Sequence, residues 1–142
     1  MEATEVIRCR GHPLVSASHP TTFEVTVEQG LTRNGHCIIG VGADKGAVRL
    51  SHWFKEVLCH NDASLLTTLS CGDFSVDVHS CGSAAMTLNH QTDLVWRKSN
   101  FVCGRTIGIH SDQVAVTLPG GLVGLLKAGR PLLVTMVARR PG

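Results

Sequence analysis

The chain has 142 residues, which is enough for one compact domain with its own core and too few for two independent domains. Hydrophobic residues make up 43% of it, but aromatic residues only 4%, which argues against an aromatic peptide groove or a platform of stacking rings. Thirteen basic and eleven acidic residues give a net charge of +2, an excess too small to identify a polyanionic partner by itself.

The first residues and the cysteines bear on the cellular compartment. The chain begins MEATEVIRCRG, without the apolar core of a signal peptide, and its longest apolar runs are far too short to span a membrane. The six cysteines are scattered and form no CxxC pair. We therefore expect a soluble cytoplasmic protein with reduced thiols and no membrane partner.

A stretch near the N-terminus, GHPLVSASHPTTFEV, recurs in the second half as GSAAMTLNHQTDLVW. Three positions are identical at a shift of 71 residues: Gly11/Gly82, His19/His90 and Thr21/Thr92. An apolar run follows in both copies. In the first copy, residues 22–28 alternate, which predicts a half-buried antiparallel strand with Phe23, Val25 and Val27 inward.

The match continues at a shift of 68 residues through IIGVGADKGAVRL (38–50) and TIGIHSDQVAVTL (106–118). Six positions are identical here: Ile39/Ile107, Gly40/Gly108, Asp44/Asp112, Ala47/Ala115, Val48/Val116 and Leu50/Leu118. The change of shift is absorbed between a loop at 31–37 and a shorter one at 102–105. The first loop contains RNG, residues 33–35, which predicts a tight turn.

Each copy then continues with a helical pattern and a strand. SHWFKEVLCHNDA predicts a short helix with Ser51 as its N-cap, followed by a strand at residues 64–70. PGGLVGLLKAGRP predicts the second helix, with Pro119 near its start and Gly129 near its end, although its internal glycines weaken it. The last predicted strand covers residues 131–138.

These elements predict one domain, residues 1–142, built from two tandem repeats of about 5–70 and 76–138. Neither repeat has enough turns to close a sheet alone, so we expect the two to pack about a pseudo-twofold axis and share a core. The predicted fold is mostly β with two short helices (α+β), arranged as a closed or partly closed β-barrel. The alternative is an open α+β two-layer sandwich.

The motifs GHPLVSASHPTTFEVT, GHCIIGVGADKGA and HQTDLVWRKSNFVCGRTIGIHSD resemble an uncharacterised, mainly archaeal family, the domain-of-unknown-function family 371. The resemblance extends from about Val6 to about Val137. The family pattern often has GHP and HPT in the second half, where this chain has CGSA and HQT, and Gly-Asp where this chain has Gly35-His36. The resemblance implies a small single-domain intracellular protein and brings no established activity.

The residues retained in both repeats form the first candidate site: His19, Thr21, Asp44, His90, Thr92 and Asp112. A pseudo-twofold axis could bring the two imidazoles together with the aspartates beside them, which would suit a divalent metal or an oriented general base. In the other interpretation each histidine hydrogen-bonds the backbone of its own turn. No zinc motif is present, so we predict no structural metal.

The second candidate is a basic patch of Arg97, Lys98 and Arg105 in WRKSNFVCGR. Adjacent residues of a strand point to opposite faces, so Arg97 and Lys98 share one face only if a bulge intervenes. The same run contains Cys103, but the first repeat has no cysteine there, which excludes a duplicated catalytic thiol.

Two functions remain open on this sequence. The first is a non-catalytic binding module that contacts RNA or a ribonucleoprotein partner through its basic face. The alternative is a small-molecule or metal-dependent enzyme with its site at the pseudo-twofold between the repeats. The sequence identifies no cofactor, substrate or oligomeric state.

Overall fold

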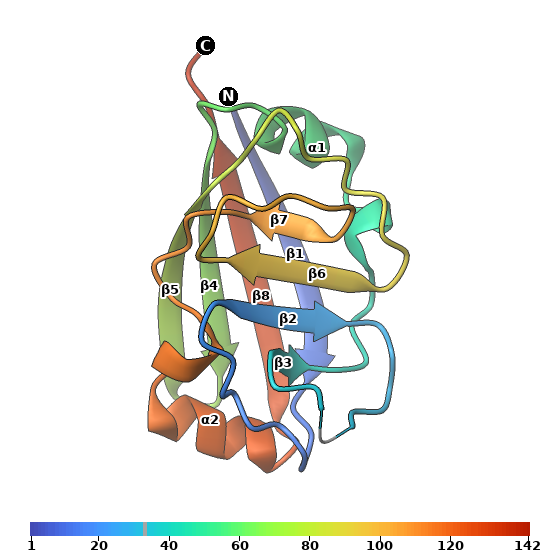
Figure 1. The fold of residues 1–142 in the computed structure, drawn as a ribbon, viewed down its shortest axis with the longest axis vertical. Helices are drawn as coiled ribbons and strands as arrows, with labels where there is room; N and C mark the ends of the chain where they lie inside the picture. Colours follow the sequence, from blue (N-terminus) through green and yellow to red (C-terminus); the bar gives the residue numbers. More distant parts are fainter. Residues whose placement is uncertain (33) are drawn as a thin grey trace.

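Two four-stranded sheets pack face to face in the computed structural model of the protein, and their strands cross one another (Figure 1). The structure describes residues 1–32 and 34–142, so the turn predicted at 33–35 lies partly outside the described residues. The antiparallel long sheet has the order β1 (Glu2–Arg10), β8 (Pro131–Arg139), β4 (Ser64–Cys71) and β5 (Phe74–Cys81). The short sheet has the order β3 (Ile38–Gly40), β2 (Thr22–Thr26), β6 (Asp93–Arg97) and β7 (Thr106–Gly108). Its central pair is antiparallel and its two outer pairs are parallel.

The prediction of a mostly β fold with two helices is confirmed, but the prediction of a closed barrel is wrong. The two sheets are separate, which fits the alternative sandwich. A single isolated bridge links the sheets at each side, Arg10 with Val41 and Cys81 with Ile109. Directly after each bridge the backbone enters the left-handed region, at Gly42 with a φ of 64° and at His110 with a φ of 51°. A left-handed residue interrupts the regular extended backbone, and beyond it a further backbone hydrogen bond joins each side, from the Asp44 N–H to the Arg8 carbonyl at 3.1 Å and from the Asp112 N–H to the His79 carbonyl at 3.0 Å.

Two short helices, α1 (His52–Leu58) and α2 (Gly120–Lys127), cover opposite ends of the sandwich (Figure 1). The predicted cap of α1 is confirmed, because Ser51 Oγ accepts a hydrogen bond from the Phe54 N–H at 3.2 Å. Helix α2 forms despite its glycines because Leu122 and Leu126 are fully buried in the core. Among the described residues, no helix has the length and apolar character that a membrane crossing needs.

The inward faces of β2 and β6 meet in an aromatic pair. The rings of Phe23 and Trp96 stack with centroids 4.5 Å apart and planes 12° apart, and both side chains are fully buried. Trp96 Nε1–H donates a hydrogen bond to Thr67 Oγ1 of the long sheet at 2.9 Å, which satisfies the buried indole. The prediction that Phe23 faces the core is therefore confirmed.

Strand β2 is not half-buried as predicted, because the residues of its opposite face are also buried: Thr22, Glu24 and Thr26. A side chain from the loop before β7, Arg105, lies against Glu24, and Cys37 from the loop before β3 lies near the same carboxylate. The outward face of β2 is thus polar and covered, an arrangement that the alternating sequence pattern does not reveal.

The order of the elements is the same in both halves of the chain. Each half has a long strand, two short strands, a 3-10 turn (η1, Ala47–Arg49; η2, Ala115–Thr117), a helix and a final long strand. Exchanging every strand for its counterpart in the other half leaves the strand order of both sheets unchanged. Ala17 and Leu88, which are 71 positions apart, both have a φ of 48°, an uncommon conformation for residues other than glycine. That the halves arose by duplication stays a prediction.

Candidate functional site

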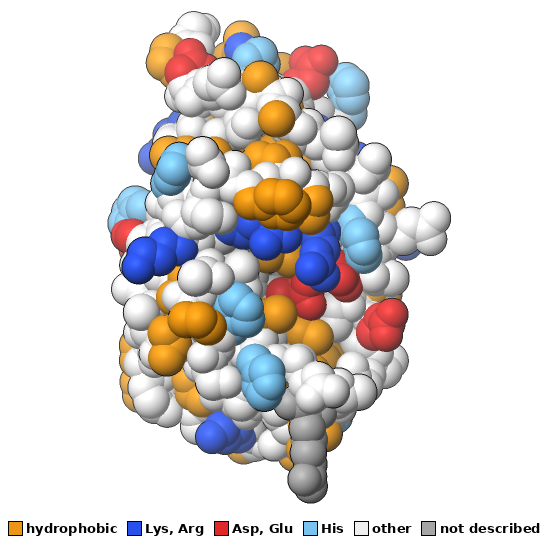
Figure 2. Space-filling view, viewed as in Figure 1, with side chains coloured by type: hydrophobic (Ala, Val, Ile, Leu, Met, Phe, Trp, Pro, Cys, Tyr) orange, Lys and Arg blue, Asp and Glu red, His pale blue; other side chains and the backbone are white. Residues whose placement is uncertain are grey.

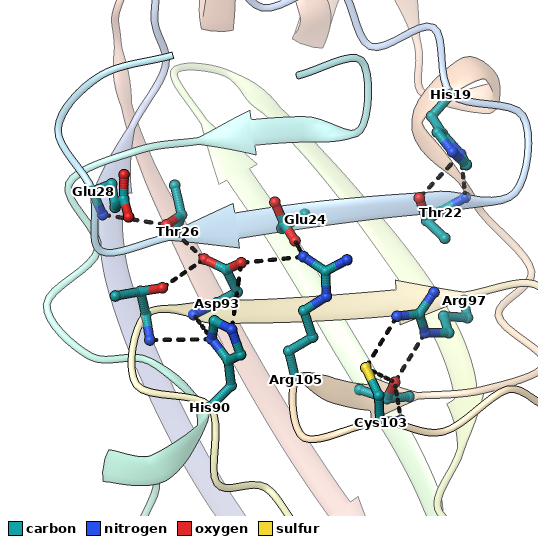
Figure 3. A network of polar contacts seen from close by, with 12 residues as sticks. His19, Thr22, Glu24, Thr26, Glu28, His90, Asp93, Arg97, Cys103 and Arg105 are labelled. Carbon is teal, nitrogen blue, oxygen red and sulfur yellow. Dashed lines mark hydrogen bonds and ion pairs between the residues drawn. The ribbon is translucent and has the colours of Figure 1, made fainter. Parts of the chain in front are cut away.

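Polar side chains gather on the outward face of the short sheet, over β2 and β6 (Figure 2). Because Phe23 and Trp96 point inward, the alternate residues of both strands point outward. They face one another in three register pairs: Thr22–Arg97, Glu24–Val95 and Thr26–Asp93. The loop before β7 adds a thiol and a guanidinium. We call the five ionisable residues of this face the outward network (Figure 3): Glu24, Asp93, Arg97, Cys103 and Arg105.

Arg105 joins two carboxylates that come from different strands. Its Nη1 lies 2.9 Å from Glu24 Oε1 and 3.2 Å from Asp93 Oδ2. The Arg105 backbone is fixed as well, because its carbonyl accepts a hydrogen bond from the Val95 N–H at 2.8 Å. Asp93 Oδ1 accepts hydrogen bonds from Thr26 Oγ1 at 2.8 Å and Thr92 Oγ1 at 2.9 Å. This part of the network therefore bridges the first and second halves of the chain.

The Glu24 carboxyl titrates near neutrality. Burial, followed by the negative charge of Asp93, raises its pKa to about 7. Arg105 and Arg97 act in the opposite direction and offset only part of that rise. The carboxyl group is therefore poised between its charged and neutral forms at physiological pH.

The Cys103 thiol also titrates near neutrality. Burial works to raise its pKa, but hydrogen bonds from the Arg105 backbone, the Thr106 hydroxyl and the Arg97 guanidinium lower it to about 7. Arg97 Nη2 lies 3.3 Å from Cys103 Sγ, and Arg97 Nε donates to Thr106 Oγ1 at 2.9 Å. These two contacts hold the guanidinium plane, which also lies over the ring of Phe101, with Cζ 4.9 Å from the ring centroid.

The structure does not bring His19 and His90 together. His19 Nδ1 accepts hydrogen bonds from the N–H groups of Thr21 and Thr22 at 3.2 and 3.1 Å. His90 Nδ1 likewise accepts from the N–H groups of Thr92 and Asp93, at 3.3 and 2.9 Å. The two turns lie at opposite ends of the β2–β6 pair (Figure 3), about 13 Å apart along a five-residue strand. One metal ion cannot bridge that distance.

Asp44 and Asp112 do not join the two histidines either. Asp44 Oδ1 accepts a hydrogen bond from the Arg8 N–H of β1 at 3.2 Å. Asp112 accepts one from the His79 N–H of β5 at 2.8 Å and lies 3.1 Å from His79 Nδ1. Each aspartate thus ties the turn after a short strand to an opposite edge of the long sheet. The carboxylate near His90 is instead Asp93, 4.0 Å from His90 Nε2.

The predicted basic patch is divided. Arg97 and Arg105 share the outward face, whereas Lys98 is exposed just after the end of β6. Among residues 1–32 and 34–142, no three His, Cys, Asp or Glu side chains are placed to hold a metal ion, and no enclosed pocket is found.

Sequence reasoning missed Glu24 and Asp93, and it set Cys103 aside as a catalytic thiol. It searched for residues that both repeats retain, whereas Glu24 corresponds to Val95 and Cys103 to Gly35. The available signal was a charged residue within an alternating strand, since an acidic side chain there must find a partner if its face is covered.

Comparison with known proteins agrees with the resemblance of the sequence motifs. Residues 7–139 match the family described as "Domain of unknown function (DUF371)". The chain is also 38% identical over 132 residues to Uncharacterized protein MJ0206 of Methanocaldococcus jannaschii, and the alignment covers 93% of this chain and 97% of that protein. The chain therefore belongs to the DUF371 family, whose function is unknown.

Proposed function

We propose that this protein is a binding module whose outward network contacts single-stranded RNA, free or within a ribonucleoprotein. The observation that carries the proposal is the stack of Arg97 on Phe101, with 4.9 Å between Cζ and the ring centroid and 58% of Phe101 exposed. Single-stranded nucleic acids bind where an exposed aromatic ring stacks a base and neighbouring cations contact the phosphates.

The rigidity of Arg97 supports this proposal. Its Nε and Nη2 are held by Thr106 Oγ1 and Cys103 Sγ, so its side chain is ordered before a ligand arrives. An arginine that is already fixed loses less conformational entropy when it binds a phosphate or stacks on a base. Phe101 supplies the neighbouring aromatic face, and Lys98, just after the end of β6, adds an exposed positive charge.

The two histidines supply donors at the ends of the same face. Because Nδ1 of His19 and of His90 accepts backbone hydrogen bonds, the proton of each neutral ring is on Nε2. Nε2–H groups are suitable donors to phosphate oxygens. In this proposal the repeated His-x-Thr motif fixes its own turn through Nδ1 and offers Nε2 to the ligand.

The proposal is tested with a short fluorescent single-stranded RNA at two salt concentrations. Arg97→Ala and Phe101→Ala are each expected to weaken binding roughly tenfold, since stacking on an aromatic ring contributes about 1–3 kcal/mol per base. Arg130→Ala and Phe74→Ala are the matched controls, because each removes an exposed side chain of the same type from outside the short sheet. Equal losses in test and control variants, or affinity that is independent of salt, would contradict the proposal.

One observation favours an enzyme as the second candidate. Cys103 and Glu24 both have a pKa of about 7, and the negative charge of the Cys103 thiolate contributes to the raised pKa of Glu24. A thiolate near a carboxyl that can carry a proton matches the nucleophile and general acid of covalent catalysis. This candidate keeps the predicted location between the two halves but uses different residues from the retained histidines.

The enzyme candidate is tested with p-nitrophenyl acetate, which acylates thiolates and releases a coloured phenolate. An enzyme of this kind is expected to release more than one equivalent per protein, and Cys103→Ser is expected to abolish the release. If the wild-type protein and Cys103→Ser release phenolate at the same rate, this candidate fails.

We also propose that the two halves are a tandem duplication and that the outward network lies on their pseudo-twofold axis. The β2–β6 register supports this: Glu24 pairs with Val95, which is its own counterpart 71 positions later. A residue that faces its own counterpart lies beside the axis that relates them. Glu24 is therefore the point at which the two halves contribute to one site.

A further inference from the structure

We propose that ligand binding at the outward network is coupled to proton uptake by Glu24, which shares Arg105 with the incoming phosphate. This inference rests on the proposed function and adds its regulation, because it makes the affinity for a phosphate ligand dependent on pH near neutrality. It concerns the part of the network that bridges β2 and the loop before β7.

The geometry places Arg105 between the carboxylates and the solvent. The side chain of Arg105 is 40% exposed, whereas that of Glu24 is 5% exposed and that of Asp93 is 17% exposed. Both carboxylates contact the same nitrogen, Nη1, at 2.9 and 3.2 Å. A phosphate that reaches Arg105 from solvent therefore becomes the third anion around one guanidinium.

Three anions around one cation repel one another, and this repulsion is relieved when one of them takes up a proton. The Asp93 carboxylate has hydrogen-bonding partners besides Arg105, because the hydroxyls of Thr26 and Thr92 donate to its Oδ1. Among the described residues, Glu24 has one hydrogen-bonding partner for its carboxylate, Arg105 itself. When the phosphate draws Arg105 away, Glu24 is the group that takes the proton.

Several ionisable groups surround Glu24, and the pH dependence caused by Glu24 has to be distinguished from their titration. Asp93 and Arg97 face it from β6, Arg105 and Cys103 from the loop before β7, and Cys37 from the loop before β3. The pKa of Glu24 is already about 7 without a ligand, so a modest further rise brings uptake into the physiological range. Cys103, whose pKa is also about 7, is the group whose titration overlaps that of Glu24.

The direction of the effect follows from linkage. Above about pH 7 free Glu24 is charged, so binding that raises its pKa is accompanied by proton uptake, and affinity falls by up to about tenfold per pH unit until the pH passes the higher pKa of the bound state, where the dependence ends. Below that pH the carboxyl is protonated before binding, and its contribution becomes flat. Binding should therefore weaken as the pH rises above about 7, over the range from about pH 7 to pH 8.5.

The experiment measures the affinity for short labelled single-stranded RNA across that range, for the wild-type protein, Glu24→Gln and Cys103→Ser. We expect the pH dependence to disappear in Glu24→Gln and to persist in Cys103→Ser. If Glu24→Gln keeps the dependence, or Cys103→Ser alone removes it, the inference is wrong although the protein binds RNA.

A second measurement keeps the inference testable if Glu24→Gln does not fold or if RNA does not bind. The titration of the Glu24 carboxyl carbon in the wild-type protein is followed by NMR, with and without sodium tripolyphosphate. An upward shift of its midpoint with tripolyphosphate supports the coupling, even where failure of RNA binding has overturned the proposed ligand. If the titration midpoint of Glu24 is unchanged both with RNA and, in a separate sample, with tripolyphosphate, the coupling itself is wrong.

Discussion

The β2–β3 and β6–β7 strand pairs have the same backbone arrangement and different outward side chains. Each is a parallel pair whose register shifts at the same place, between Glu24 and Val25 in one and between Val95 and Trp96 in the other. The Glu24 N–H donates to the Cys37 carbonyl at 2.9 Å, as the Val95 N–H donates to that of Arg105 at 2.8 Å. The same backbone positions thus carry Glu24 and Cys37 in one pair, Val95 and Arg105 in the other.

This difference indicates that one set of residues determines the shared backbone and a different set determines the chemistry of the site. Residues common to both pairs build turns and core, whereas the outward network is made from positions that differ between them. Its central ion pair needs one residue from each, Glu24 from β2 and Arg105 from the loop before β7. If this interpretation is right, exchanges between the two pairs should have unequal effects.

The largest difference between the two strand pairs is expected in how much their core residues contribute to stability. Trp96→Ala should destabilise the protein by about 3–5 kcal/mol, because it removes the stack on Phe23 and the hydrogen bond to Thr67. Val25→Ala, at the corresponding position, should cost about 1.5–3 kcal/mol, since a smaller fully buried side chain is lost. Urea unfolding of both variants measures the difference, and equal losses would show that the two strands contribute alike to the core.

The second expected effect is the pH dependence of stability that Glu24 confers. Its pKa is about 7 in the folded protein and about 4.5 in an unfolded chain, so the folded state binds this proton more tightly. Stability from Glu24 is therefore full below about pH 4.5 and falls as the pH rises to about 7, by about 3 kcal/mol. Glu24→Gln should remove this loss, so that it exceeds the wild-type protein in stability at pH 8 but not at low pH.

Glu28→Gln is the matched control, because Glu28 is exposed just beyond the end of β2. It should leave the pH profile of the unfolding free energy unchanged. A wild-type profile that is flat between pH 5 and pH 8, after subtraction of the Glu24→Gln profile, would contradict the assignment of a raised pKa to Glu24.

The third expected effect is a difference in thiol reactivity between the loop before β3, which contains Cys37, and the loop before β7, which contains Cys103. Burial, followed by the charge of Glu24, raises the pKa of Cys37, whereas hydrogen bonds lower that of Cys103 to about 7. At pH 7 iodoacetamide should therefore alkylate Cys103 about ten times faster than Cys37, after allowance for the lower nucleophilicity of a more acidic thiol. Peptide mass spectrometry measures both rates in one sample. Arg97→Gln should narrow the difference, and equal rates in the wild-type protein would remove the electrostatic distinction between the loops.

Local patterns in the sequence were sufficient to predict individual elements of the molecule, but not the arrangement of its two sheets or its site. Ser51 as the cap of α1 and Phe23 in the core follow from local patterns, because capping and alternation depend on neighbours in sequence. The choice between barrel and sandwich depends instead on how the two sheets meet, which is at isolated bridges that are each followed by a left-handed residue, Gly42 or His110. Nothing in local hydrophobic periodicity reports such a conformation in a histidine.

The outward network escaped prediction for a related reason. Retained residues drew attention to His19 and His90, whose Nδ1 atoms each accept backbone hydrogen bonds within their own turns. Glu24 and Cys103, whose pKa values are both shifted to about 7, stand at positions where the two halves have different residues. Arg105 reaches Glu24 from 81 positions away in the sequence, whereas Arg97 and Cys103 lie six positions apart, at the end of β6 and in the loop before β7.

The smallest expected effect tests the backbone that the two pairs share. His110 and Gly42 occupy corresponding positions with φ values of 51° and 64°, and both N–H groups bond carbonyls in corresponding loops, Ser99 and Glu28. A left-handed conformation costs a non-glycine residue about 1–2 kcal/mol, part of which glycine returns through its greater freedom when unfolded. His110→Gly should therefore stabilise the protein by about 0.5–1 kcal/mol, and Gly42→Ala should destabilise it by at least about 1 kcal/mol. Thermal unfolding measures both. If both substitutions change the stability in the same direction, the two turns are not equivalent. The similarity of the two strand pairs would then be limited to their strand-to-strand hydrogen bonds.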